Sequence, residues 1–250
     1  MTTPQLSTFS ISDQDVEFYK ENGYLMLGKV MSDETLEKFR ALIPTLPKRP
    51  EDKGTFFYTQ LRGKHPLIMD FATEGNQIEA MKKLIGPNLR CWFDQFVVKA
   101  PDTADKARNT FPWHQDNGYG GLEPGTNITV WFALDDVTPD NGCVWVVPGS
   151  HKKGLIPHIK KSEDSWHIEV DVEGNGTPAN LKAGEAIAFT GYTLHRSLQN
   201  QTNNDRRAFF LEYCDADALD KGTPINQHPP DAFYAGGMSP VICGVSKYNP

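Results

Sequence analysis

The segment LRCWFDQFVVK, residues 89–99, begins a part of the chain in which short β-like runs replace helical patterns. These runs are rich in β-branched and aromatic residues and are separated by Gly, Pro, Asn and Asp, as is typical of strands joined by turns. Because no helical segment lies between them, they predict a mainly β core of the antiparallel sandwich or jelly-roll type. The predicted strands are Leu89–Lys99, Ile128–Leu134, Val144–Val147, Trp166–Val172, Ala186–Thr190, His195–Gln199 and Arg206–Tyr213.

The residues before Leu89 predict peripheral helices around one short strand. Ser12 and Asp15 have the spacing of a capping box, so a helix begins there and ends at Gly23. The remaining elements predicted in this part are a strand at Tyr24–Leu27, a helix from Ser32 that ends at Pro44, and a helix from about Gln77 to Ile85.

Length and composition place the chain among soluble globular proteins. Its 250 residues predict one domain, 1–250, with a helical N-terminal part at about 12–88, a jelly-roll core at about 89–214 and a tail at 215–250. The net charge of −7 argues against a nucleic-acid partner, which would need a basic surface. No apolar run approaches the roughly 20 residues of a membrane span, so we expect no membrane partner.

The cysteines and the N-terminus predict the compartment. The four cysteines lie far apart, without a C-x-x-C pair, which favours reduced thiols over disulfides or a zinc site. The N-terminus lacks the basic and apolar segments of a signal peptide. These features predict a cytoplasmic protein.

Two histidines have an acidic residue two positions later, a spacing that directs both side chains of a strand to one face. One pair is His167 and Glu169, which alternates with apolar residues and is therefore expected on the solvent face of an amphipathic strand. The other pair is His114 and Asp116, which lies between aromatic residues and glycines, as suits a pocket wall. The second pair is the better candidate for a metal site.

A third ligand is available at His195, at the start of a predicted strand. Two histidines and one carboxylate are the ligands of the non-haem Fe(II) oxygenases. Taken alone, His195 also has a purely structural interpretation as a buried core histidine.

Arg206 supplies a further signal if the strands on either side of residues 200–205 pair. That pairing would set Gln199 opposite Arg206 and His195 opposite Phe210, so Arg206 would face inward with His195 and Arg207 would face outward. An inward guanidinium suits the far carboxylate of a dicarboxylate bound to iron. The structural alternative is a surface charge at a strand edge.

These residues belong to a longer pattern that resembles the phytanoyl-CoA dioxygenase family. The matching motifs are WHQD at 113–116, WFALDD at 131–136, NGC at 141–143 and VPGSH at 147–151, with HRS at 195–197 and the opening helix FYKENGY at 18–24. The resemblance extends from about residue 13 to 213 and implies a double-stranded β-helix core with helices packed outside it.

The resemblance also implies Fe(II), O2 and 2-oxoglutarate as cofactor and co-substrates. It makes His114, Asp116 and His195 the metal-binding and catalytic residues. The residues that it implies for the 2-oxoglutarate pocket are Arg206, Ser197, Trp131 and Gln95.

The predicted activity is hydroxylation of an aliphatic C–H bond of a small-molecule metabolite, with release of succinate and CO2. Asp116 argues against halogenation, because halogenating relatives have a small residue at that position. Desaturation, epimerisation and ring closure use the same ligands and stay open. The alternatives from other classes are a cupin-type Zn or Mn hydrolase or isomerase and a binding protein with a degenerate site. The sequence does not predict the substrate or the oligomeric state.

Overall fold

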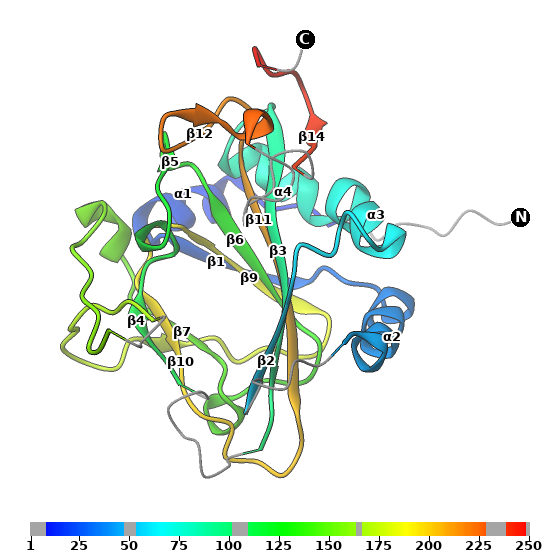
Figure 1. Ribbon diagram of the computed structural model, residues 1–250, viewed down its shortest axis with the longest axis vertical. Coiled ribbons are helices and arrows are strands. Elements are labelled where there is room, and N and C mark those ends of the chain that lie inside the picture. Colours follow the sequence, from blue (N-terminus) through cyan, green and yellow to red (C-terminus); the bar gives the residue numbers. More distant parts are fainter. Residues whose placement is uncertain (1–8, 48–53, 102–109, 164–166, 229–238, 249–250) are drawn as a thin grey trace, which may run out of the picture.

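A computed structural model describes residues 9–47, 54–101, 110–163, 167–228 and 239–248 (Figure 1). Its core consists of two antiparallel sheets, which confirms the mainly β prediction. In the larger sheet the strand order is β1-β9-β6-β11-β3-β14, with β2 also paired to β3. These strands are β1 (Tyr24–Lys29), β2 (Thr55–Thr59), β3 (Leu89–Lys99), β6 (Ile128–Ala133), β9 (Glu185–Thr190), β11 (Arg206–Asp215) and β14 (Val241–Cys243).

The smaller sheet has the order β4-β10-β7-β8, and a third, three-stranded sheet has the order β13-β12-β5. The strands of the smaller sheet are β4 (Phe111–His114), β7 (Val144–Val146), β8 (Thr177–Pro178) and β10 (His195–Ser197). Those of the third sheet are β5 (Leu122–Glu123), β12 (Leu219–Asp220) and β13 (Thr223–Pro224). Two of these sheets therefore contain strands of the tail after residue 215, because β14 belongs to the larger sheet and β12 and β13 to the third.

The helices are α1 (Asp13–Asn22), α2 (Asp33–Leu42), α3 (Pro66–Glu74) and α4 (Gln77–Leu84). The capping box at the start of α1 is present, with Ser12 and Asp15 bonded to each other's backbone N–H groups, as predicted. α3 is absent from the helices expected from the sequence, although Pro66 at its first position is a typical helix start. None of the helices in the described ranges is both long and apolar enough to cross a membrane.

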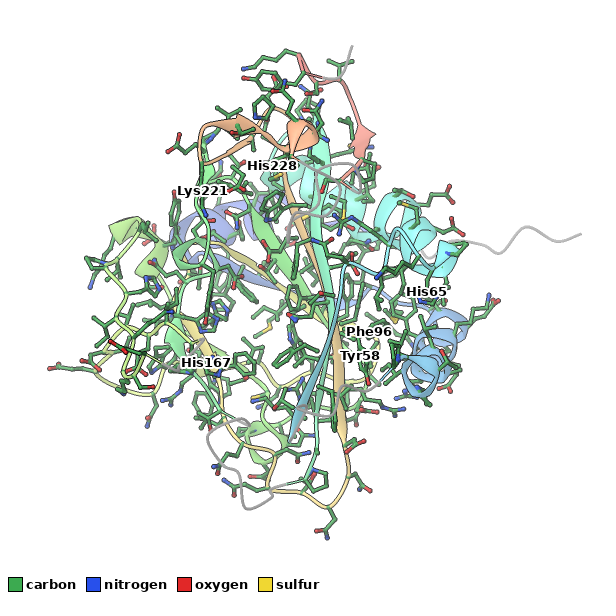
Figure 2. The ribbon with its side chains drawn as sticks, in the orientation of Figure 1. Tyr58, His65, Phe96, His167, Lys221 and His228 are labelled. Carbon is green, nitrogen blue, oxygen red and sulfur yellow. The ribbon has the colours of Figure 1, made fainter. Side chains whose placement is uncertain are left out.

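The helices cover the outer face of the larger sheet. Phe39 of α2 is fully buried there, with its ring 5.0 Å from that of Phe71 in α3 and 5.1 Å from that of Phe209 in β11. Figure 2 shows Tyr58 and Phe96 on this side of the sheet, toward α2. This aromatic cluster joins the helical layer to the sheet.

The inner face of the larger sheet is turned toward the smaller sheet. Along β11, Phe209 and Leu211 belong to the helix-side core, whereas Ala208 belongs to the core between the sheets. By alternation, Arg206 and Glu212 lie on the same inner face as Ala208. This face carries the charged groups that the candidate site uses.

The predicted strand at Trp166–Val172 is wrong for the residues that the structure describes. Trp166 lies outside the described residues, and residues 167–172 make only an isolated bridge between Ile159 and Glu169. Glu169 is buried beside Lys161 instead of lying on an exposed strand face. The alternation of polar and apolar residues in 167–172 therefore belongs to a loop and not to a strand.

The predicted pairing of residues 195–199 with 206–210 is also wrong. β10 pairs with β4 and β7, whereas β11 pairs with β3 and β6. The connection crosses from one sheet to the other, and the side chain of Asn200 holds it by donating to the backbone oxygens of Lys99 and Asn204. A short polar loop predicts a hairpin locally, but a jelly roll sends successive strands to opposite sheets.

Replacing Phe39 with Ala should destabilise the protein by about 3–5 kcal/mol, because it leaves a cavity between the helices and the sheet. The measurement is the free energy of unfolding in urea. Leu155→Ala is the control, since that side chain is 54% exposed, and it should change stability by no more than about 0.5 kcal/mol. Equal losses in the two variants would contradict this account of the core.

Candidate functional site

Three predicted ligands meet between the two sheets. His114 ends β4 and His195 begins β10, and the two are directly paired across the smaller sheet. Asp116 starts the short 3-10 helix that follows β4. Its Oδ1 lies 3.3 Å from Nε2 of His195 and 3.9 Å from Nε2 of His114. One ligand atom from each of the three residues falls within 4.8 Å of the others, which is close enough to share one ion.

Both imidazoles are oriented by the backbone. Nδ1 of His114 lies 2.7 Å from the carbonyl oxygen of Pro112, and Nδ1 of His195 lies 3.0 Å from that of Thr193. Because a carbonyl only accepts, each Nδ1 carries a hydrogen, and each Nε2 is the ring nitrogen that can bind a metal ion when it is unprotonated. Histidines that bind metals are held in this way.

The carboxylate of Asp116 is fixed from the opposite sheet. The hydroxyl of Thr129, on β6, donates to Oδ2 of Asp116 at 2.5 Å. That bond leaves Oδ1 facing the two imidazoles. The sequence analysis did not single out Thr129, although alternation along 128–134 would have placed it on the same face as Trp131.

The charge state of the cluster suits a cation. Burial and the neighbouring His195 lower the pKa of His114 to about 3. Burial opposes ionisation of Asp116, but His195 and His114 stabilise the carboxylate and lower its pKa to about 2. Burial likewise opposes protonation of His195, yet Asp116 raises its pKa. At neutral pH the cluster therefore offers an anionic carboxylate and a neutral His114, the forms that bind metals.

Gln115 lies between the ligand His114, in β4, and the ligand Asp116, in the 3-10 helix. It has a structural role that the sequence did not reveal. Its side chain is fully buried, and its amide donates to the carbonyl oxygens of Gly154 and Tyr192 at 2.9 and 2.6 Å. Its amide oxygen accepts from the backbone of Ile156 at 2.7 Å. Gln115 thus ties the segment 148–161 to the metal cluster.

Arg206 lies on the inner face of the larger sheet, at the other end of the site. Its guanidinium is buried, and its Nε and Nη1 have no hydrogen-bond partner among the described residues. It stacks over Trp131 at 5.4 Å, and burial lowers the pKa of Arg206 to about 10. A buried guanidinium with free donors suits a carboxylate ligand.

Trp131 bridges the two ends of the site. It lies two residues after Thr129 on the same face of β6, a separation of about 7 Å along the strand. Thr129 binds Asp116 at one end of this face, and Trp131 stacks against Arg206 at the other. The two ends are therefore close together and buried. A small dicarboxylate that binds the metal at one end could meet the guanidinium at the other.

Arg207 lies on the opposite face of β11, as the sequence predicted. Its Nε and Nη2 bind the two carboxylate oxygens of Asp135 at 3.0 and 2.6 Å, and its side chain is partly exposed. The predicted strand pairing was wrong, but alternation along β11 alone gives the same orientation for both arginines.

Ser197 and Gln95 both lie in the space between the sheets. Ser197 shares the buried face of β10 with His195, and its carbonyl oxygen accepts from Lys99. Gln95, on β3, is half-buried and lies opposite Phe210, which is in turn opposite Trp131. Their roles in the 2-oxoglutarate pocket stay predictions.

His167 and Glu169 do not form a metal site. The ring of His167 packs edge-on against Phe111 at 4.9 Å, and Glu169 pairs with Lys161 at 2.6 Å. Figure 2 shows His167 beside β4 and β10. Among the described residues, one group of three side chains is placed to hold a metal ion, and it consists of His114, Asp116 and His195.

Known proteins resemble this chain in sequence and in fold. The family model "Phytanoyl-CoA dioxygenase (PhyH)" matches residues 19–208. A probable phytanoyl-CoA dioxygenase of Caenorhabditis elegans is 26% identical, over 83% of this chain and 76% of that protein. The structure of the non-heme alpha ketoglutarate dependent carbocyclase SnoK from nogalamycin biosynthesis matches with a TM-score of 0.71 and 22% identity, over 93% of this chain and 96% of that one.

A second similar structure is the epimerase SnoN in complex with Fe3+, alpha ketoglutarate and nogalamycin RO. It matches with a TM-score of 0.72 and 20% identity, over 88% of this chain and 90% of that one. The two enzymes share the fold with this chain and differ from each other in the reaction that they catalyse.

The variants His114→Ala, Asp116→Ala and His195→Ala should each weaken Fe(II) binding at least about 100-fold, because a ligand matters more than the groups that orient it. Binding is measured by anaerobic equilibrium dialysis, and circular dichroism should show an intact fold. His167→Ala is the matched control and should bind Fe(II) like the unmodified protein. Normal Fe(II) binding by any of the three variants would remove that residue from the site.

Proposed function

Because the chain belongs to the phytanoyl-CoA dioxygenase family of Fe(II)- and 2-oxoglutarate-dependent oxygenases, we propose that it hydroxylates an aliphatic C–H bond of a small-molecule metabolite. Iron supplies the oxidative decarboxylation of 2-oxoglutarate to succinate and CO2, coupled to oxidation of the substrate. His114, Asp116 and His195 would hold the iron through the three atoms that the fold brings together.

The other residues of the site bind and orient the co-substrate. Arg206 would bind the far carboxylate of 2-oxoglutarate with its free Nε and Nη1, and Ser197 would add a hydroxyl. Trp131 supports the guanidinium and, with Gln95, forms part of the wall of the pocket. The buried position of Arg206 excludes water from this ion pair and so strengthens it.

The observation that carries the proposal is the combination of the triad with a buried, unpartnered arginine on the same inner surface. A hydrolase or isomerase of cupin type could use the same three ligands with zinc or manganese. Such an enzyme would have no co-substrate for Arg206, and a buried guanidinium without a partner is costly. The combination of the triad with the buried Arg206 therefore favours a 2-oxoglutarate-dependent oxygenase.

Features outside the pocket argue against an acyl-coenzyme A substrate. Coenzyme A carries phosphates, which would need free basic groups near the entrance. In the segment 148–161, Lys152 pairs with Glu21 and Lys161 pairs with Glu169. Two of the four lysines of this segment therefore have carboxylate partners, which favours a smaller metabolite.

The test is Fe(II)-dependent release of succinate from 2-oxoglutarate, followed by mass spectrometry of the products from a metabolite mixture. Hydroxylation adds one oxygen atom to the substrate, whereas desaturation or ring closure removes two hydrogens and epimerisation leaves the mass unchanged. Turnover with zinc or manganese that consumes no 2-oxoglutarate would identify the cupin-type alternative instead.

The two arginines of β11 should respond differently to substitution. Arg206→Ala should raise the KM for 2-oxoglutarate at least about 10-fold, since a charge-assisted hydrogen bond contributes roughly 1.5–3 kcal/mol. Arg207→Ala should change KM by less than about twofold, because its partner is Asp135 on the outer face. Steady-state assays of succinate release measure both. A larger effect at Arg207 than at Arg206 would contradict the assignment.

A further inference from the structure

Charged side chains of both signs lie on the inner face of the larger sheet. Lys99 of β3 and Arg206 of β11 lie opposite each other at one end, and both are buried. Glu212 lies on the same face of β11 six residues later, about 20 Å along the strand. The positive end suits the co-substrate, and the acidic end has no role in the function proposed above.

Glu212 is close to the metal cluster. It is 8% exposed, and in the sheet it lies directly opposite Thr129, whose hydroxyl binds Asp116. Directly opposite residues on one face of a sheet have Cβ atoms about 5 Å apart. A group bound to Glu212 would therefore lie beside the metal, where the substrate of an oxygenase must lie.

The carboxyl of Glu212 has no cationic partner among the residues that the structure describes. The positive charge of Arg62 acts on Glu212, but Arg62 is bound to the fully buried Asp94 at 2.6 Å. The side chain that forms a hydrogen bond with the carboxyl of Glu212 is the uncharged amide of Asn127. Burial, with the charge of Asp116, raises the pKa of Glu212 well above its ordinary value.

Asn127 adds a second acceptor at the same place. Its Oδ1 is buried and has no hydrogen-bond partner in the described part of the chain. The amide packs so closely against Gly191 that a Cβ there would lie 2.4 Å from it, which fixes the position of the side chain. The acidic end of the site thus presents a carboxyl group and a free carbonyl oxygen, both of which accept hydrogen bonds.

We propose that Glu212 and Asn127 bind a positively charged nitrogen of the primary substrate, which is then an amine. An ammonium group donates up to three hydrogen bonds and would neutralise the carboxylate of Glu212 in a buried setting. A carboxylate or phosphate at this position would meet a carboxyl group and a carbonyl oxygen, and neither offers it a positive charge. The inference rests on the proposed function, because it assigns the substrate of that same site.

The experiment compares two fractions of a metabolite extract, the cations retained by a strong cation exchanger at pH 7 and the neutral and anionic flow-through. The protein is loaded anaerobically with Fe(II) and 2-oxoglutarate and incubated with each fraction. After ultrafiltration, mass spectrometry identifies the metabolites that the protein retains. Without oxygen the measurement reports binding alone.

The intact protein should retain at least one amine from the cationic fraction, and Glu212→Gln should retain it at least about 10-fold less. Glu123→Gln, at an exposed carboxyl on β5, is the matched control and should retain it normally. The iron content of Glu212→Gln should equal that of the intact protein. Thermal denaturation checks folding, and Glu212→Asp, which keeps the charge, should recover part of the binding.

Three results of the binding experiment would overturn the proposal. In the first, the intact protein retains nothing from the cationic fraction. In the second, Glu212→Gln retains the amine as well as the intact protein does. In the third, Glu212→Gln loses iron, which would make Glu212 part of the metal site. Admission of oxygen then tests the proposed function separately. Succinate release with only neutral or anionic metabolites would reject the amine and leave the oxygenase intact.

Discussion

The hydrogen bond from Thr129 to Asp116 is the contact on which the site depends, because it joins the two sheets at the metal cluster. Both histidines belong to the smaller sheet, where β4 and β10 pair them directly. The carboxylate follows β4 but is held by the larger sheet through β6. The cluster therefore requires the correct separation of the sheets. The outer helices support that separation indirectly, since the aromatic cluster around Phe39 holds the larger sheet against them.

The inner face of the larger sheet then determines what can bind around the metal. The contacts from Thr129 through Trp131 lead to the free guanidinium of Arg206, which accounts for a dicarboxylate. In the other direction Glu212 and Asn127 present acceptors without a cation. Under our proposals, one sheet would thus bind two different ligands. The smaller sheet contributes the histidines, so binding and metal chemistry come from separate layers of the fold.

The sequence predicted the strands and the triad better than it predicted their pairing. Alternation is a local property, so it identified β3 with its bounds and placed Arg206 and Arg207 on opposite faces. Pairing is a long-range property, and the loop at 200–205 resembles a hairpin turn although it crosses between sheets. The strand expected at Trp166–Val172 failed for the same reason, because tertiary contacts of Glu169 replaced sheet pairing. Thr129 and Glu212 carry no motif, so only the fold reveals them.

Lys99 connects β10 to the larger sheet next to Arg206. Its backbone is paired with Arg206 in the larger sheet, while its Nζ donates to the carbonyl oxygens of Ser197 and Leu198 at the end of β10. Burial and the charge of Arg206 hold the pKa of Lys99 well below its ordinary value. Two adjacent buried cations repel each other, and a bound dicarboxylate would relieve that repulsion. The same lysine therefore links the two sheets and favours an anionic co-substrate beside Arg206, and under our proposal the substrate lies toward Glu212.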